Sequence, residues 1–187
     1  MRQVIQFSAF DQGDGDSQDL VVKEVAIVNP DTDTSQSWLF KAPFPFADLA
    51  LALKYTNEYI SKHSIGLRWD EDGDIEYSSL KTVLVTYTQG SSTLFTFGST
   101  RQHFLERLLE RPIINLEDLH CPKYTDLCFP TTACAHPRHQ FEKYRCVLKE
   151  AKTYGHYLKY LELSRYILPP VFPTYTPTPI SDSDVDS

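Results

Sequence analysis

Hydrophobic residues fall into short runs with the two-residue period of strands and into longer segments with the period of helices. Three strand-like runs come first, over residues 3–10, 20–29 and 37–41, with short polar turns between them. Such closely spaced runs predict an antiparallel meander. The predicted elements that follow are a helix over residues 47–63, a short helix over 78–85, a strand over 93–97, a helix over 99–110, a strand over 112–116 and a long helix over 141–163.

Two local signals add detail to this pattern. The run over residues 20–29 is apolar on both faces except at Lys23 and Glu24, as expected of a strand inside a sheet. Ser99 followed by Gln102 resembles a capping box, which predicts that a helix begins at this point.

The order of the predicted elements, β-β-β-α-β-α-β-α, resembles that of the RNase H-like fold. We therefore expect an α/β domain in which helices flank a mixed five-stranded sheet, with three antiparallel strands followed by a β-α-β unit. A length of 187 residues, 41% of them hydrophobic, suits one such domain over residues 1–167.

Residues 168–187 are rich in Pro, Ser and Asp and predict a disordered acidic tail. The simplest interpretation is a solubilising terminus. The alternative is a short motif that binds a protein partner, or a phosphorylation site at Ser181 and Ser183.

The net charge of −7 argues against a protein that coats nucleic acid with its whole surface, but it leaves room for a local basic face. Met1 is followed by Arg-Gln-Val-Ile-Gln, which lacks the apolar segment of a secretory signal. No apolar stretch approaches the length of about 18 residues that indicates a membrane span. We expect an intracellular protein, cytoplasmic or nuclear.

All four cysteines and three of the six histidines lie between His120 and Cys146. Zn²⁺ takes four N or S ligands, and one short loop can bring them together at a small entropic cost. The clustering therefore predicts a structural zinc site. The proposed ligands are Cys121, Cys134, His139 and Cys146, with His136 and Cys128 as substitutes.

Three other interpretations of the cluster stay open. Free cysteines often pack as small hydrophobic residues, and two disulfides would form if the chain were secreted. A catalytic zinc would keep three protein ligands and one open position. Cys134 has histidines nearby in sequence, which is a weak signal for a nucleophile, because sequence neighbours need not form an oriented pair.

Several segments look like the DEDD 3′–5′ exonuclease branch of the RNase H-like fold. The first predicted strand ends at Phe10-Asp11, where that branch carries the first acid of a D-x-E motif. The segments T-F-G-S-T-R-Q-H-F-L and R-C-V-L-K-E-A stand where the branch has a G-H-N-x-x-F-D-like and an H-R-A-L-x-D-A-like segment. The resemblance covers residues 3 to about 163.

The chain departs from this pattern at the acids. The chemistry of the branch needs four carboxylates that hold two metal ions. Gly13 stands where the motif has Glu, the middle segment offers no acid, and Arg145 replaces the general-base histidine. The resemblance thus implies a catalytically silent domain. The alternative, an active metal-dependent exonuclease, would use Asp11, Glu117 and Glu150.

A degenerate nuclease fold with a Cys/His zinc cluster is similar in design to the Maelstrom-type domain. The combined pattern K-E-V-A-I…F-K-A-P-F…N-L-E-D-L-H-C-P…C-x-H…C also looks like uncharacterised invertebrate, viral or mobile-element proteins. These resemblances imply a fold and no particular activity.

The function expected from these observations is a silent exonuclease-like domain that binds single-stranded RNA or DNA, or a protein partner. The predicted nucleic-acid-binding residues are Arg101, Lys143 and Arg145, with Lys41 and Arg68 as further cations and Trp69 and Tyr144 available to stack on bases. The remaining alternative is a protein-interaction module that acts through the acidic, proline-rich tail.

Overall fold

The computed structural model describes residues 1–13, 20–129, 131, 136–140 and 143–167. They contain a five-stranded sheet with the strand order β3-β2-β1-β4-β5. β1 pairs antiparallel with β2, as does β2 with β3, whereas the β1–β4 and β4–β5 pairs are parallel. The strands are β1 (Arg2–Asp11), β2 (Leu20–Asn29), β3 (Thr34–Leu39), β4 (Thr93–Thr96) and β5 (Ile114–Asn115).

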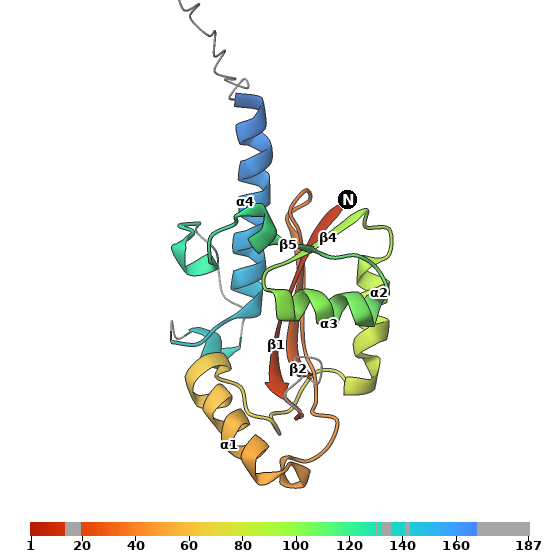
Figure 1. The fold of residues 1–187 in the computed structure, drawn as a ribbon, viewed down its shortest axis with the longest axis vertical. Coiled ribbons are helices and arrows are strands. Elements are labelled where there is room, and N and C mark those ends of the chain that lie inside the picture. Colours follow the sequence, from red (N-terminus) through yellow and green to blue (C-terminus); the bar gives the residue numbers. More distant parts are fainter. Residues whose placement is uncertain (14–19, 130, 132–135, 141–142, 168–187) are drawn as a thin grey trace, which may run out of the picture.

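Helices cover both faces of this sheet, so the expected RNase H-like α/β fold class is confirmed. In Figure 1, α2 and α3 lie on one side of the strands, α4 runs along the other side, and α1 lies below them. The helices are α1 (Leu51–Ile60), α2 (Leu80–Thr88), α3 (Ser99–Leu109) and α4 (Val147–Ile167).

Alternating residues of the strands supply two separate cores. Ile5 and Phe7 of β1 pack with Leu84 of α2 and Leu105 of α3, whereas Val4 packs on the opposite face with residues of α4 such as Tyr154. A third cluster around Trp69 closes the end of the sheet near α1. The two-residue period of a strand explains why neighbouring residues serve different cores.

A β-bulge in the central strand pair sets the position of two charged residues. Ser8 of β1 faces Glu24 of β2, but the next residue, Ala9, faces Val22. Lys23 is therefore the extra residue on β2. Because directly opposed residues share a face of the sheet, Glu24 and Ser8 lie side by side.

Close packing between α4 and β2 depends on a glycine. A Cβ atom at Gly155 would lie 3.3 Å from Cγ1 of Val28, so the absence of a side chain lets the helix approach the strand. Beside it, the buried ring of Tyr154 stacks on Phe97 with a centroid distance of 4.8 Å. The first turns of α4 are thereby held firmly against the sheet.

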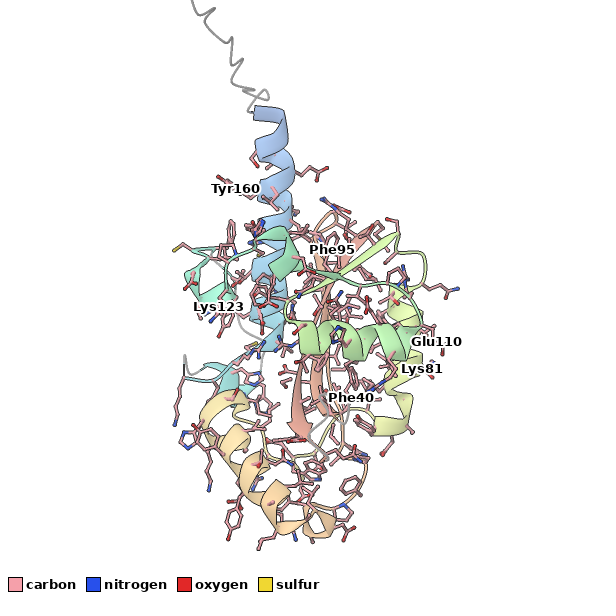
Figure 2. All side chains as sticks on the ribbon, in the orientation of Figure 1. Phe40, Lys81, Phe95, Glu110, Lys123 and Tyr160 are labelled. Atoms are coloured by element: carbon pink, nitrogen blue, oxygen red, sulfur yellow. The ribbon has the colours of Figure 1, made fainter. Side chains whose placement is uncertain are left out.

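An ion pair joins α2 to the end of α3, and the end of α4 extends away from the sheet. Figure 2 shows Lys81 of α2 beside Glu110, which follows α3, and these side chains form an ion pair at 2.6 Å. The last turns of α4, which follow Tyr160, project beyond the sheet. Among the described helices, none combines the length and the apolar character that crossing a bilayer requires. The predicted acidic tail lies outside the described residues.

Candidate metal centre and adjoining cleft

Glu24, His139 and Cys146 form a buried group on the α4 side of the sheet. Glu24 comes from the middle of β2, His139 from the short helical turn Pro137–Gln140, and Cys146 from the residue before α4. One atom of each side chain lies within 4.8 Å of the others. Segments far apart in sequence thus bring O, N and S donors to one point.

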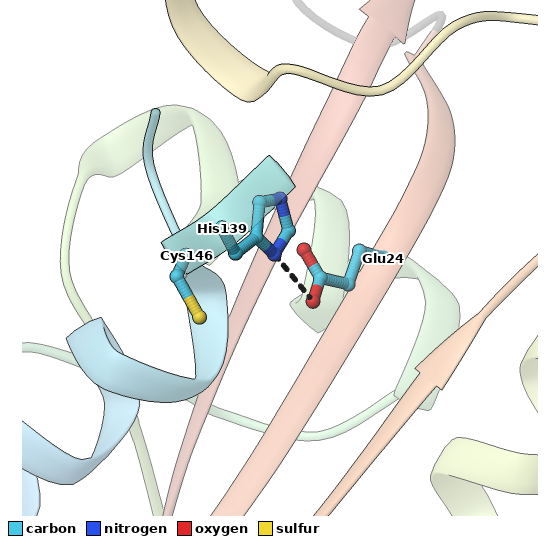
Figure 3. Close-up of side chains that lie close together, drawn as sticks. All are labelled: Glu24, His139 and Cys146. Atoms are coloured by element: carbon cyan, nitrogen blue, oxygen red, sulfur yellow. Dashed lines mark ion pairs between the residues drawn. The ribbon is translucent and has the colours of Figure 1, made fainter. Parts of the chain in front are cut away.

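The imidazole of His139 lies between the other two side chains (Figure 3). Its Nδ1 is 3.6 Å from Oε1 of Glu24, and its Nε2 is 3.0 Å from the carbonyl oxygen of Ile65. A carbonyl oxygen only accepts hydrogen bonds, so Nε2 carries a proton and donates it. Nδ1 is therefore the ring nitrogen that faces the group.

The surroundings of His139 favour a positive charge. Burial alone would lower the pKa of its imidazole, but the hydrogen bond with Cys146 and the nearby carboxylate of Glu24 together raise this pKa above its usual value. A buried carboxylate needs a compensating cation. Without a metal ion, a protonated His139 supplies that positive charge.

The same three atoms suit a metal ion. Carboxylate O, imidazole N and thiolate S are all zinc ligands, with bonds of about 2.0–2.3 Å. Histidine ligands typically donate their other N–H to a carbonyl group, as Nε2 of His139 does here. Ligand atoms up to 4.8 Å apart would have to move together by about 1 Å to share one ion. A buried metal ion fits this group after a small contraction.

The predicted zinc ligands are divided between different surroundings. His139 and Cys146 belong to the buried group, and Cys134 lies outside the described residues. Cys121 packs in the apolar core beneath α4, and burial raises the pKa of its thiol to about 12. Its Sγ donates to the carbonyl oxygen of Pro122 at 3.4 Å. In the described structure Cys121 therefore has the surroundings of a core residue.

Neither of the two substitute ligands is among the three clustered side chains. The thiol of Cys128 is exposed. The ring centroid of His136 lies 5.2 Å from that of His139, and its Nε2 is 3.4 Å from Oε1 of Glu71. His136 is thus a close neighbour of the group and interacts with a different carboxylate.

A cleft of about 460 Å³ opens beside this group, where β1 and β4 separate. The two parallel strands pair only as far as Val4 and Phe95, and their carboxyl ends then diverge. Ligands of open α/β sheets commonly bind at such a point. The cleft is lined by residues of β1 and α3, by Leu20 of β2, by Ile60, Ser64 and Ile65 at the end of α1, and by Gly98, Glu117 and Arg145.

Arg101 fills the space between the separated strands. Its Nε donates to the carbonyl oxygen of Phe7 at 2.9 Å, and its Nη1 donates to that of Phe97 at 2.8 Å. Burial lowers the pKa of this guanidinium group to about 10, and the nearby Arg145 adds to the effect. The side chain nonetheless stays charged at neutral pH.

Glu150, in the first turn of α4, is held by arginine. Nε and Nη2 of Arg145 each lie 2.6 Å from one of its carboxylate oxygens, which is a bidentate pair, and Nη1 of Arg101 is 3.8 Å away. The carboxylate of Glu150 is almost fully buried. Two guanidinium groups therefore neutralise the one carboxylate that α4 directs into this region.

The three carboxylates of the exonuclease alternative do not form a group. Asp11 accepts a hydrogen bond from the backbone N–H of Gly13 at 3.0 Å, and Glu117 accepts one from Nδ2 of Asn115 at 3.1 Å. Glu24, His139 and Cys146 are the only group of metal-ligating side chains found in the described part of the chain. The face of β1 towards α4 carries Gln6 and Ser8, which are neutral.

The other residues predicted to contact nucleic acid differ in their exposure. Lys143 is exposed, with its Nζ 5.3 Å from the ring centroid of Tyr144. Trp69 is buried in the core near α1, where its ring N–H donates to the carbonyl oxygen of Phe44, so it does not offer a stacking surface. Exposed aromatic surface comes instead from Tyr55 and Tyr59 of α1.

Sequence reasoning missed Glu24 and Ser8. A signal for Glu24 was present, because a charged residue inside an otherwise apolar strand must be paired or bind a metal. Ser8 gave no signal, since a serine in a strand is ordinary.

No protein-family model matches the chain, and no curated protein has a similar sequence. The assignment of the fold class therefore rests on the order of the strands. The exonuclease and Maelstrom resemblances stay predictions.

Proposed function

We propose that this protein is a catalytically silent exonuclease-like domain that contains a structural zinc ion and binds single-stranded nucleic acid. The observation that carries the proposal is the bidentate Arg145–Glu150 pair, with bonds of 2.6 Å. Two-metal phosphodiester hydrolysis needs free carboxylates close together. Here the carboxylate of α4 is neutralised by arginine.

Neighbouring residues support the loss of activity. Gln6 and Ser8 offer an amide and a hydroxyl group where β1 faces α4, and neither group can replace a carboxylate as a charged ligand for Mg²⁺. Asp11 and Glu117 are bonded elsewhere. Arg101 and Arg145 also offset the charges of Glu117 and Glu150, so the side chains of the cleft carry no net negative charge that would attract metal cations.

The zinc part of the proposal rests on Glu24, His139 and Cys146. All three are buried, and the ion would join β2 to the start of α4. A structural zinc site takes four protein ligands and contributes directly to folding, so the proposed ion needs one ligand besides these three.

The nucleic-acid part rests on the cleft and on α1. Arginine side chains suit phosphate groups, and exposed tyrosines suit unpaired bases. Tyr55 and Tyr59 are 68% and 67% exposed, and Ile60, the last residue of the same helix, lines the cleft. A single strand could therefore contact both features, despite the overall charge of −7.

The test combines three measurements on one purified sample. Elemental analysis gives the zinc content, fluorescence polarisation gives the affinity for a labelled single strand, and incubation with Mg²⁺ or Mn²⁺ shows whether the strand is degraded. We expect about one zinc ion per chain, measurable binding and an intact strand.

Glu117→Gln is the control variant for the activity measurement. Glu117 is exposed at the edge of the cleft, so the substitution should leave the fold unchanged. For a silent domain, it removes a charge that repels phosphate, and binding stays the same or becomes tighter. Degradation by the wild type that disappears in this variant would establish an active exonuclease and overturn the proposal.

A further inference from the structure

The first turn of α3 faces the cleft without a capping side chain. Gly98 precedes the helix with φ of 105°, and among the described residues no side chain accepts a hydrogen bond from the first turn. The expected capping box at Ser99 and Gln102 is wrong, because Gln102 donates its side-chain N–H to the carbonyl oxygen of Ile113 instead. The first N–H groups of this 11-residue helix are thus available to an anion.

A second observation points independently to a ligand at this place. Ser8 lines the same cleft and is only 3% exposed, yet its Oγ has no hydrogen-bond partner among the described residues. Buried hydroxyl groups in folded proteins nearly always have a partner. A bound acceptor in the cleft would supply the one that Ser8 lacks.

The charges around the cleft favour an anion of low charge. Arg101 and Arg145 contribute two positive charges, and Glu117 and Glu150 contribute two negative ones. The carboxylate of Glu150 accepts hydrogen bonds from Arg145, whereas Nη2 of Arg101 has no hydrogen-bond partner among the described residues. The partial positive charge at the start of α3 then tips the balance towards a singly charged anion.

We propose that this cleft binds one phosphate group of a single-stranded nucleic acid. The first-turn N–H groups of α3 and the hydroxyl of Ser8 donate hydrogen bonds to it, and the guanidinium of Arg101 balances its charge. The inference rests on the proposed nucleic-acid binding and adds the place where the strand is held. A phosphodiester carries a single negative charge, which agrees with the charges around the cleft.

Thr100→Glu tests the site without weakening the fold. Thr100 is exposed in the first turn of α3, where a carboxylate interacts favourably with the helix dipole, so the melting temperature should stay the same or rise. The same carboxylate repels a phosphate at the cleft. We expect the affinity for a labelled single strand of about ten nucleotides to fall about tenfold.

Thr82→Glu is the matched control. Thr82 is exposed in the first turn of α2 and does not line the cleft, so this variant makes the same change in composition and net charge at another helix start. Its affinity for the strand should equal that of the wild type.

Ser8→Ala tests the hydroxyl separately. The folded protein has no hydrogen bond to lose at this Oγ, so its stability should not fall. Loss of one hydrogen bond to a charged phosphate should weaken binding of the strand about tenfold.

Further outcomes separate this inference from the proposed function. If the wild type binds the strand and both Thr100→Glu and Ser8→Ala bind it equally well, the cleft is not the phosphate-binding site. The proposed function then stands. If the wild type binds no strand, but inorganic phosphate raises its melting temperature and not that of Thr100→Glu, the site binds free phosphate. The proposal that the phosphate belongs to a nucleic acid is then wrong. If neither the strand nor phosphate binds, both proposals fail.

Discussion

At the scale of single residues, two adjacent buried charges on β2 are held by different parts of the molecule. Lys23 is fully buried, and its Nζ donates to the carbonyl oxygen of Trp69 at 3.0 Å and to that of Glu71. Glu24, at 4% exposure, faces His139 on the other side. The bulge in the strand separates the two side chains, so each charge finds its own partners.

Lys23 should make stability depend on pH. Burial lowers the pKa of its ammonium group from 10.5 to about 8, although the acids Asp70, Glu71 and Asp72 partly oppose the shift. Between about pH 8 and pH 10.5, the unfolded chain therefore binds a proton that the folded chain does not, and the free energy of unfolding rises with pH. The full rise from this residue would be about 3 kcal/mol.

Urea unfolding of the wild type and of Lys23→Met across this pH range checks the prediction. Subtracting the variant removes the contributions of the cysteines and tyrosines that titrate in the same range. The free energy of unfolding of the wild type should increase relative to that of Lys23→Met as pH rises. A difference that stays flat would mean that Lys23 keeps an ordinary pKa in the folded protein.

Cys146→Ser should remove the metal ion and lower stability together. A structural ion that binds only the folded chain stabilises it by about 3 kcal/mol at about 100 times its Kd. Elemental analysis and thermal unfolding of the same samples measure both effects. Cys121→Ser is the control, since Cys121 is buried outside the group and its loss should lower stability while zinc stays bound. Loss of zinc in Cys121→Ser would instead make Cys121 a ligand.

At the scale of elements, the end of α1 determines how the chain reaches the cleft and the metal group. The π-helical turn Ser61–Ile65 follows α1 and ends at Gly66, whose φ is 69°. The backbone N–H of Arg145 donates to the carbonyl oxygen of Ser64, and Nε2 of His139 contacts that of Ile65. One turn therefore positions both the arginine that holds Glu150 and the histidine of the metal group.

Gly66→Ala should be strongly destabilising for two separable reasons. A Cβ atom there would lie 2.6 Å from the ring of Tyr144, and the positive φ disfavours any side chain. Gly90 has φ of 82° with nothing within 4 Å of its Cβ position, so Gly90→Ala measures the conformational cost alone. We expect the free energy of unfolding to fall by about 1–2 kcal/mol in Gly90→Ala and by about 2–4 kcal/mol in Gly66→Ala. Equal losses in chemical denaturation would mean that Tyr144 moves away freely.

The sequence predicts elements well where periodicity alone decides them. The second strand was expected over residues 20–29 and is found at Leu20–Asn29, because a long apolar run between polar turns leaves few alternatives. The last helix begins at Val147 and not at residue 141, because the contact between Arg145 and Ser64 holds residues 143–146 in another conformation. Such tertiary contacts have no local signature.

The site was predictable only in part for the same reason. Clustering in sequence pointed to His139 and Cys146, since a short loop can bring its own ligands together. Glu24 and Ser8 lie on strands far away in the chain, and only the pairing of β1 with β2 and the packing of α4 bring them to the group and the cleft. The bonds between Arg145 and Glu150 also depend on the observed start of α4.

At the scale of the whole molecule, charge limits how nucleic acid can bind. A chain with a net charge of −7 repels a polyanion over most of its surface, so attraction must be confined to a few groups around the cleft. The described surface near α1 and the cleft supplies Lys143, Arg145 and exposed tyrosines for this purpose. Such an interface engages few phosphates and relies more on stacking and on hydrogen bonds than basic coat proteins do.

The salt dependence of binding should therefore be shallow. If about two phosphates are neutralised, the logarithm of the affinity for a single strand should fall against the logarithm of salt concentration with a slope of about −1.4. Tyr59→Ala should weaken binding about tenfold with the slope unchanged, because stacking releases no counterions. Tyr160→Ala, at an exposed position in the C-terminal half of α4, should alter neither quantity. A much steeper slope would require many cationic contacts, which would place the strand on a surface other than the cleft.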